Sequence, residues 1–399
     1  MKSRNQRSGG SGQRSEISGQ SGQKSAVRAV RSQRSEITGQ RTSDFCPLTS
    51  DRCPLRPLPP DLCPLPSDRC PLTAVPSDRC PLPSPPFPPM SIQFRSLSKQ
   101  YRAGAEAVCN LTFEIAPGSV FALMGRNGAG KTTTIHLLLD LILPSGGEAR
   151  IFGVPAAKLR PEHRQRIGYV SENQRLPDWM RVEEFLRFLK PMYPTWDDSL
   201  TQKLVKLFAL PMSQRLDRLS RGQRMKVAFL GALCYRPEVL ILDEPFSGLD
   251  SVMRQDLLDA LIEFLGEDER TVLLSSHDLG EVERLADTIG VLNHGRLGLL
   301  GNINDLLTSS REVSFLTSNP TPQGELPRDW WNLTTGPHGL TFTAAGVTDD
   351  TALTATILTF WPDATHLTLR PPGLSRFYID YLRHTESPNG ISLADNGTK

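Results

Sequence analysis

A chain of 399 residues, of which 38% are hydrophobic and 22% charged, is long enough for two or three domains with sizeable cores. Its 45 Lys and Arg balance 43 Asp and Glu, and a net charge of +2 gives no reason to propose nucleic acid as the main ligand. The best apolar run, IHLLLDLIL, contains His136 and Asp140 and falls short of the ~20 residues that span a bilayer. We therefore expect a globular protein that does not cross a membrane by itself.

Residues 1–89 are predicted to form a disordered, low-complexity tail. Five Cys-Pro-Leu motifs place cysteines at positions 46, 53, 63, 70 and 80, with a spacing that alternates between seven and ten. Many prolines and few apolar side chains leave nothing from which to build a core. Zinc ligation is the alternative, but structural zinc ligands lie about two to four residues apart, and His136 is the first histidine. Strand-like alternation begins after Met90, so we expect the functional protein to start there and the tail to be a spurious extension.

The stretch SVFALMGRNGAGKTTTIHLLLDLIL predicts a short apolar strand, a glycine-rich turn and a helix. It fits the pattern G-x-x-x-x-G-K-[ST], in which backbone amides and the helix N-terminus surround phosphate groups. Lys131 then reaches the terminal phosphates, and Thr132 offers a hydroxyl to magnesium. The glycines that allow the tight turn are Gly125, Gly128 and Gly130. The apolar residues expected on one face of the helix are Ile135, Leu138, Leu139 and Ile142.

Residues 177–219 are predicted to be mostly helical, and a second anion site follows them. The segment VEEFLRFL has an apolar stripe at helical spacing, which is more typical of a core than of an interface. In LSRGQ, Ser220 and Gly222 stand where the next helix begins, and a helix N-terminus favours an anion. Arg236 and Pro237 end that helix. The stripe of the earlier segment comprises Val182, Phe185, Leu186 and Leu189. The buried face of the later helix comprises Met225, Phe229, Ala232 and Leu233.

Two later strands are predicted to end on chemically active side chains. In EVLILDEP, Asp243 and Glu244 stand at the carboxyl end of a buried strand, where doubly wound sheets bind ligands. Asp243 suits a magnesium-side carboxylate, and Glu244 suits a base that activates the attacking water. The strand TVLLSSH ends on His277, whose imidazole could contact a γ-phosphate.

The final segment, residues 311–399, is predicted to be a small α+β domain. Alternating apolar residues in EVSFLTS, GLTFTAAG and HLTLRPP indicate strands, and LSRFYIDYL indicates an amphipathic helix. We expect this domain to regulate or brace a dimer without chemistry of its own.

Together these motifs resemble the nucleotide-binding subunit of an ATP-binding cassette (ABC) transporter, from about residue 91 to residue 307. GRNGAGKT resembles its Walker A loop, LSRGQ its signature, VLILDE its Walker B strand and SGLD its D-loop, and Ser276 and His277 resemble its H-loop. The resemblance implies an α/β P-loop NTPase cassette over 91–310, with a RecA-like core, an antiparallel β subdomain and a helical subdomain at about 177–219. The C-terminal α+β domain, 311–399, would follow it.

The resemblance also implies the residues that bind ATP and Mg²⁺ and those that act in hydrolysis. Nucleotide contacts are implied for Tyr101, Gly125, Arg126, Asn127, Gly128, Ala129, Gly130, Lys131, Thr132, Thr133, Ser220, Gly222, Gln223 and Asp250. Catalytic roles are implied for Glu244, His277 and Lys131, and metal ligation for Thr132, Asp243 and Glu172. Tyr101 resembles the aromatic residue that stacks on adenine.

In this family two cassettes close head to tail, so the signature of one meets the γ-phosphate held by the other. Ser220, Gly222 and Gln223 are therefore expected to act in trans, and Arg221 replaces the family's usual Gly. The Q-loop also departs from the pattern, because Glu172 stands where Gln is expected and Gln174 follows two residues later. We expect Glu172 to take the role of this glutamine as a magnesium ligand, and Gln174 is the alternative. MYPTWDD and this Glu are typical of the antibiotic-export and multidrug-export branch.

The resemblance implies an ATPase that energises export through a separate membrane-spanning permease, with a second cassette as partner and no nucleic acid. We expect the chain in the cytoplasm, held at the inner face of the membrane by the permease. Outside the tail only Cys109 and Cys234 remain, which suits a reducing compartment. The alternative is a soluble ABC ATPase of DNA repair or translation, but the sequence has neither long coiled coils nor a second cassette.

Overall fold

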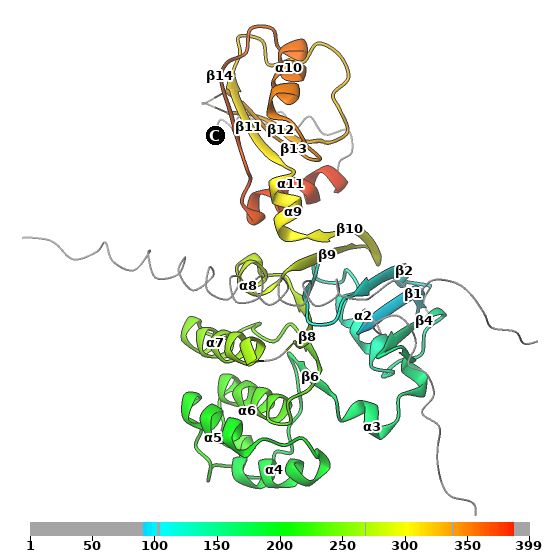
Figure 1. Ribbon diagram of the computed structural model, residues 1–399, viewed down its shortest axis with the longest axis vertical. Coiled ribbons are helices and arrows are strands. Elements are labelled where there is room, and N and C mark those ends of the chain that lie inside the picture. Colours follow the sequence, from blue (N-terminus) through cyan, green and yellow to red (C-terminus); the bar gives the residue numbers. More distant parts are fainter. Residues whose placement is uncertain (1–90, 102–103, 268, 337–338, 387–399) are drawn as a thin grey trace, which may run out of the picture. The chain divides into compact units, whose positions relative to one another are not determined.

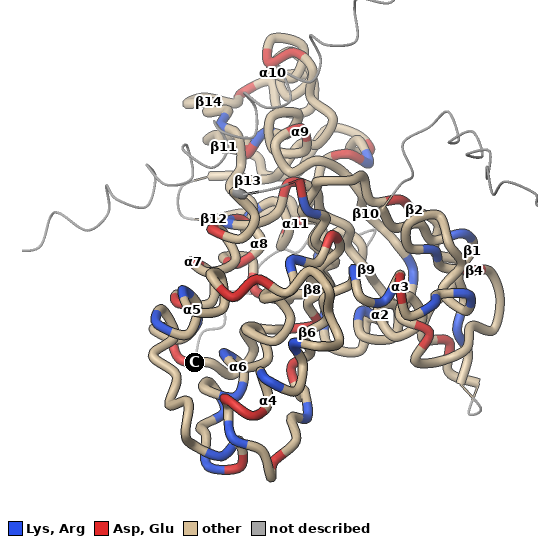
Figure 2. The backbone as a smooth tube through the Cα atoms, turned by 60° about the horizontal axis from the view of Figure 1, so that its bottom comes forward, with Lys and Arg blue, Asp and Glu red and all other residues tan. Residues whose placement is uncertain are grey.

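The structure is a computed structural model, and it describes residues 91–101, 104–267, 269–336 and 339–386 (Figure 1). The predicted tail, residues 1–89, lies outside the described residues. In the described part, no helix has the length and apolar character needed to cross a membrane. Acidic and basic residues are interspersed along it (Figure 2).

A six-stranded sheet has the strand order β10-β9-β3-β8-β7-β6. All neighbours pair in parallel except β10, which is antiparallel to β9. Every residue of β3, β7 and β8 is buried, as expected for parallel strands covered on both faces. Their carboxyl ends meet at one edge of the sheet. The strands are β3 (Val120–Met124), β6 (Ile167–Ser171), β7 (Val239–Asp243), β8 (Thr271–Ser276), β9 (Thr288–Asn293) and β10 (Arg296–Asn302).

An antiparallel sheet covers the helix that follows the glycine-rich turn. Its order is β2-β1-β4-β5, and its inward side chains share a core with α2 (Lys131–Leu138). The rings of Phe94, Phe113 and Phe121 stack in series, with centroids 4.4 and 5.2 Å apart. The strands are β1 (Ile92–Gln100), β2 (Glu106–Ile115), β4 (Gly146–Ile151) and β5 (Val154–Pro155).

The helix α2 is shorter than the sequence predicts. It ends at Leu138, so the expectation that Ile142 lies on its apolar face is wrong. Asp140 adopts a left-handed conformation with φ 59°, which turns the chain out of the helix. Ile135, Leu138 and Leu139 are buried as expected.

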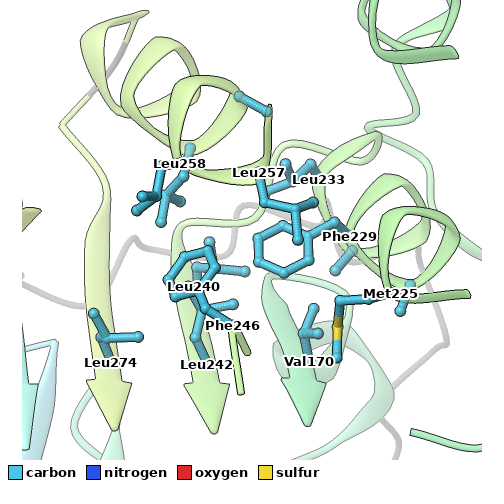
Figure 3. Close-up of a cluster of buried hydrophobic side chains, with 14 of the residues drawn as sticks. Val170, Met225, Phe229, Leu233, Leu240, Leu242, Phe246, Leu257, Leu258 and Leu274 are labelled. Atoms are coloured by element: carbon cyan, nitrogen blue, oxygen red, sulfur yellow. The ribbon is translucent and has the colours of Figure 1, made fainter. Parts of the chain in front are cut away.

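Further helices pack on the six-stranded sheet. Side chains of α6 and α7 meet those of β6, β7 and β8 in one apolar cluster that includes Phe229 and Phe246 (Figure 3). The α-helices are α3 (Pro161–Arg164), α4 (Val182–Leu189), α5 (Asp198–Leu207), α6 (Arg221–Leu233), α7 (Ser251–Glu267), α8 (Leu279–Leu285) and α9 (Ile303–Thr308). Short 3₁₀ helices are η1 (Ala156–Lys158), η2 (Lys190–Met192) and η3 (Leu216–Arg218).

A third, antiparallel sheet follows α9, in the order β12-β13-β11-β14. The helix α10 contributes Leu353 and Ile357 to its apolar core. The helix α11 is held to it by the fully buried Asp380, which accepts hydrogen bonds from Asn332 and Thr343 at 2.6 and 2.5 Å. The elements are β11 (Arg311–Leu316), β12 (Trp330–Gly336), β13 (Gly339–Ala344), α10 (Asp350–Phe360), β14 (Thr365–Arg370) and α11 (Leu374–Glu386).

Candidate functional site

The glycine-rich turn between β3 and α2 is shaped by close backbone contacts. Gly130 caps α2 in a left-handed conformation, φ 105°, and a Cβ there would lie 2.3 Å from the carbonyl oxygen of Ala107. Only glycine fits this position. Lys131 opens the helix and donates from Nζ to the carbonyl oxygen of Gly125 at 2.7 Å, so its ammonium is folded back over the turn. Amides and a cation thus face the same small region, which suits phosphate.

A carboxylate and two hydroxyls lie beside this turn. Thr132 Oγ1 donates to Asp243 Oδ1 at 3.1 Å, although the two residues are far apart in sequence. Ser275 Oγ donates to the same Asp243 oxygen at 2.6 Å. Oxygen ligands of this kind are those that Mg²⁺ prefers, usually one or two from the protein with phosphate and water completing the shell. Thr132 and Asp243 therefore fit a magnesium ion held jointly with a phosphate.

Glu244 follows β7 directly and connects Lys131 with His277. Its Oε1 lies 3.0 Å from Lys131 Nζ, and its Oε2 lies 2.7 Å from Nδ1 of His277, the first residue after β8. Only 6% of the Lys131 side chain and 13% of the Glu244 side chain are exposed, so water screens this pair less than a surface ion pair. A carboxylate between a cation and an imidazole, beside a phosphate loop, has the arrangement of a general base.

The backbone of Glu244 is strained. Its φ is 48°, a left-handed value that costs a non-glycine residue about 1 kcal/mol. Two contacts hold it there: its amide lies 3.0 Å from Ser275 Oγ and 3.2 Å from the Ser275 carbonyl oxygen. Ser275 thus positions both Asp243 and Glu244. Sequence reasoning missed this residue, although a serine before His277 at the end of a buried strand was a usable signal.

Glu172 begins the loop after β6 and points to the start of α6. Its Oε1 accepts hydrogen bonds from Arg221 Nη2 at 3.0 Å and from Ser247 Oγ at 2.9 Å, while its amide donates to the Asp243 carbonyl oxygen at 2.9 Å. Gln174 turns back on its own loop, where its Oε1 accepts from the Ser171 amide at 3.2 Å. The structure therefore places Glu172 beside the end of β7, with its carboxylate on Arg221.

The segment LSRGQ opens α6 with a reciprocal cap. Ser220 Oγ accepts from the Gln223 amide at 3.2 Å, and Gln223 Oε1 accepts from the Ser220 amide at 3.0 Å. A Cβ at Gly222 would lie 1.7 Å from Sδ of Met253, so glycine lets α6 and α7 meet closely. Arg221 Nη2 also donates to the Ser247 carbonyl oxygen at 3.0 Å. Ser220 and Arg221 are both exposed, so this helix start is accessible from outside the molecule.

The other predicted nucleotide contacts lie in the turn between β3 and α2, at the start of α2, after β1 and before α7. Tyr101 follows β1, is 45% exposed, and has Lys99 Nζ 5.4 Å from its ring centroid. Asp250 precedes α7 and accepts from the Met253 amide at 2.9 Å. The remaining members belong to the turn and the first turn of α2: Arg126, Asn127, Gly128, Ala129 and Thr133.

A pocket of about 380 Å³ lies between the loop after β6 and the exposed side of α6. Three arginines line it together with Glu172, and Arg224 also pairs with Asp178 at 2.7 Å. Trp179, next to Asp178, is 68% exposed. This combination of an arginine-lined hollow and an exposed aromatic side chain is typical of a surface that receives a partner. The lining comprises Glu172, Asn173, Gln174, Arg175, Arg221, Arg224, Met225 and Ala228.

Comparison with known proteins agrees with this geometry. A family model described as ABC transporter matches residues 108–247. An uncharacterized ABC transporter ATP-binding protein of Nostoc is 32% identical over 63% of this chain and 78% of the relative. The bacitracin transport ATP-binding protein of Enterococcus faecalis is 31% identical over 56% of this chain and 73% of the relative. Nod factor export ATP-binding protein I of Cupriavidus metallidurans is 33% identical, over 55% and 73%.

The chain belongs to the family of ABC transporter ATP-binding proteins, whose members are ATPases. The predicted fold class, a P-loop cassette with antiparallel and helical additions, is confirmed.

Proposed function

We propose that this chain binds ATP on the turn between β3 and α2 and hydrolyses it with Glu244 as the general base. The observation that carries this proposal is the contact of Glu244 with both Lys131 and His277, at 3.0 and 2.7 Å. In this assignment Lys131 neutralises the terminal phosphates, Glu244 takes a proton from the attacking water, and His277 holds Glu244 and contacts the γ-phosphate.

We also propose a head-to-tail dimer of cassettes. The exposed start of α6, with its Ser220 cap and Gly222, presents amides and positive helix potential outward, so a second copy would supply the phosphate that they bind. Asp250 would lie at the same interface.

Magnesium would be held by Thr132 and Asp243, with Glu172 as a further ligand reached through the loop after β6. When bound, the ion would neutralise phosphate charge and orient the nucleotide. Gln174 is the rival for the loop's role, and its side chain already bonds its own loop at Ser171.

If Glu172 serves the ion, Glu172→Ala should raise the magnesium concentration needed for half-maximal ATPase activity and slow turnover. Glu172→Gln should be nearly silent, because an amide oxygen can still coordinate and can still accept from Arg221. Gln174→Ala is the matched control and should change little. Magnesium titrations of the three variants measure this. A large loss of ATPase activity in Gln174→Ala, together with a small loss in Glu172→Ala, would assign the role to Gln174.

We further propose that hydrolysis energises export through a separate permease. The names of two relatives, a bacitracin transport protein and a Nod factor export protein, support this direction. The arginine-lined pocket beside α6 and the exposed Trp179 would receive a cytoplasmic segment of the permease. The domains would then be a cassette over 91–310 and an accessory domain from 311 that braces or regulates the dimer.

Co-expression tests the coupling to a permease. The partner to supply is a neighbouring gene product with several apolar segments of about 20 residues. We expect the cassette in the membrane pellet only when this partner is present, and Trp179→Ala should weaken recovery. Leu358→Ala, at an exposed apolar position of α10, is the matched control. Absence of the cassette from the pellet even when the partner is present would favour the alternative, a soluble ATPase not coupled to transport.

A further inference from the structure

A buried polar network lies directly behind His277. Ser276, fully buried at the end of β8, donates from Oγ to Glu281 Oε2 at 2.6 Å, and the same hydroxyl oxygen accepts from the Asp278 amide at 3.0 Å. Glu281 lies on α8 and is only 6% exposed. Because Ser276 and Asp278 flank His277, these bonds fix the backbone on both sides of the imidazole.

Arg254 joins this network to the turn that carries Asp250. Its amide donates to the Asp250 carbonyl oxygen at 3.0 Å, and its Nη1 donates to Asp278 Oδ2 at 3.1 Å. Its Nε lies 3.7 Å from Glu281 Oε1, is buried, and makes no hydrogen bond within the described residues. Charge-assisted hydrogen bonds are about 2.8 Å long, so a shift of about 1 Å would complete this contact.

The charges around Glu281 make the network sensitive to pH. Burial is the largest cause that raises the pKa of Glu281, the nearby carboxylates of Asp278 and Glu244 also raise it, and the resulting pKa is about 7. The hydrogen bond from Ser276 and the charge of Arg254 act in the opposite direction. Below about pH 7 the carboxyl is therefore neutral and attracts Arg254 little, whereas above it the carboxylate can hold both Arg254 and Ser276.

We propose that Glu281 and Arg254 are positioning residues that tie the Asp250 turn to the backbone around His277, and so hold the imidazole against Glu244. A movement of the Asp250 turn is carried through Arg254 to α8 and from there to His277. This inference rests on the proposed hydrolysis at Glu244. It gives a role to a buried acid and a buried guanidinium nitrogen that otherwise have none.

The first test is the pH dependence of kcat for the Glu281→Gln protein, with saturating ATP and magnesium, between about pH 6 and 9. We expect kcat of the wild type to rise through about pH 7 as Glu281 ionises. Glu281→Gln should lose this rise and, at about pH 8, turn over about tenfold more slowly, while KM for ATP stays unchanged. The matched control is Glu283→Gln, which removes the same charge from an exposed position of α8 and should behave as the wild type.

The second test is Arg254→Gln, which should move the rise in kcat to higher pH because Arg254 lowers the pKa of Glu281. A contact that only stabilised the fold would leave the pH at which kcat rises unchanged. A wild-type profile in Glu281→Gln, or equal losses in Glu281→Gln and Glu283→Gln, would overturn the inference. If Glu281→Gln fails to fold, the Arg254→Gln protein is sufficient: kcat that rises at the same pH as in the wild type would overturn the inference. Absence of hydrolysis in the wild type would instead overturn the proposed function.

Discussion

The Glu244→Gln protein is expected to bind ATP as well as the wild type does but to hydrolyse it about 100-fold more slowly or worse. The amide keeps the shape of the carboxyl and can still meet His277 and Lys131, yet it cannot take a proton from water. Hydrolysis would normally release the two cassettes, so this variant should accumulate as an ATP-bound dimer. Size-exclusion chromatography with light scattering, in ATP and magnesium, measures the dimer directly.

A matched control for this variant is Glu162→Gln on α3, where the carboxylate is exposed and away from the site. It should hydrolyse ATP at the wild-type rate and show no excess of dimer. Monomer alone in the wild type and in Glu244→Gln, at ATP concentrations that saturate binding, would argue against the closed pair of cassettes.

Lys131→Ala is expected to abolish ATPase activity by weakening both nucleotide binding and phosphate stabilisation. Its ammonium is buried over the phosphate turn, where a charge aimed at the reacting phosphate is worth about 100-fold or more in rate. The variant also leaves Glu244 without its cation. Unlike Glu244→Gln, it should therefore fail to form an ATP-dependent dimer.

Phosphate release and ATP titration separate these two variants. Lys158→Ala removes an exposed lysine of η1 and serves as the control for loss of positive charge. Near wild-type turnover in Lys131→Ala, with a thermal melt that shows a folded protein, would mean that the phosphate turn does not act in ATP hydrolysis.

Much of the site could be predicted because its chemistry is local in sequence. The phosphate turn, the carboxylates at the end of β7 and His277 after β8 each follow a buried apolar run, and parallel strands bring such ends to one edge. Which side chains then touch depends on packing. The pairing of Glu172 with Arg221 and Ser247 joins three segments, and no single segment indicates it.

Other features depended on backbone conformation or on the balance of weak preferences. The left-handed residue Asp140 ends α2 early, against the apolar periodicity that favours a longer helix. Among residues 311–386, the alternation of apolar residues predicts the strands β11, β13 and β14, whereas β12 and α10 have no such signal. The sequence of α10 is rich in threonine, which disfavours helix, and Asp349 caps it by accepting from the Thr351 amide at 2.8 Å.

An ATP site shared between two copies of the chain is tested most directly by mixing two inactive variants. Lys131→Ala disables the phosphate turn, and Ser220→Ala disables the start of α6 that serves the partner's phosphate. A mixed dimer keeps one site in which both halves are intact. Random pairing makes half of the dimers mixed, each with one working site, and the weak self-pairing of Lys131→Ala raises that share. An equal mixture should therefore recover about a quarter of wild-type ATPase activity or more. A mixture no more active than either variant alone, although light scattering shows that mixed dimers form, would contradict the shared site.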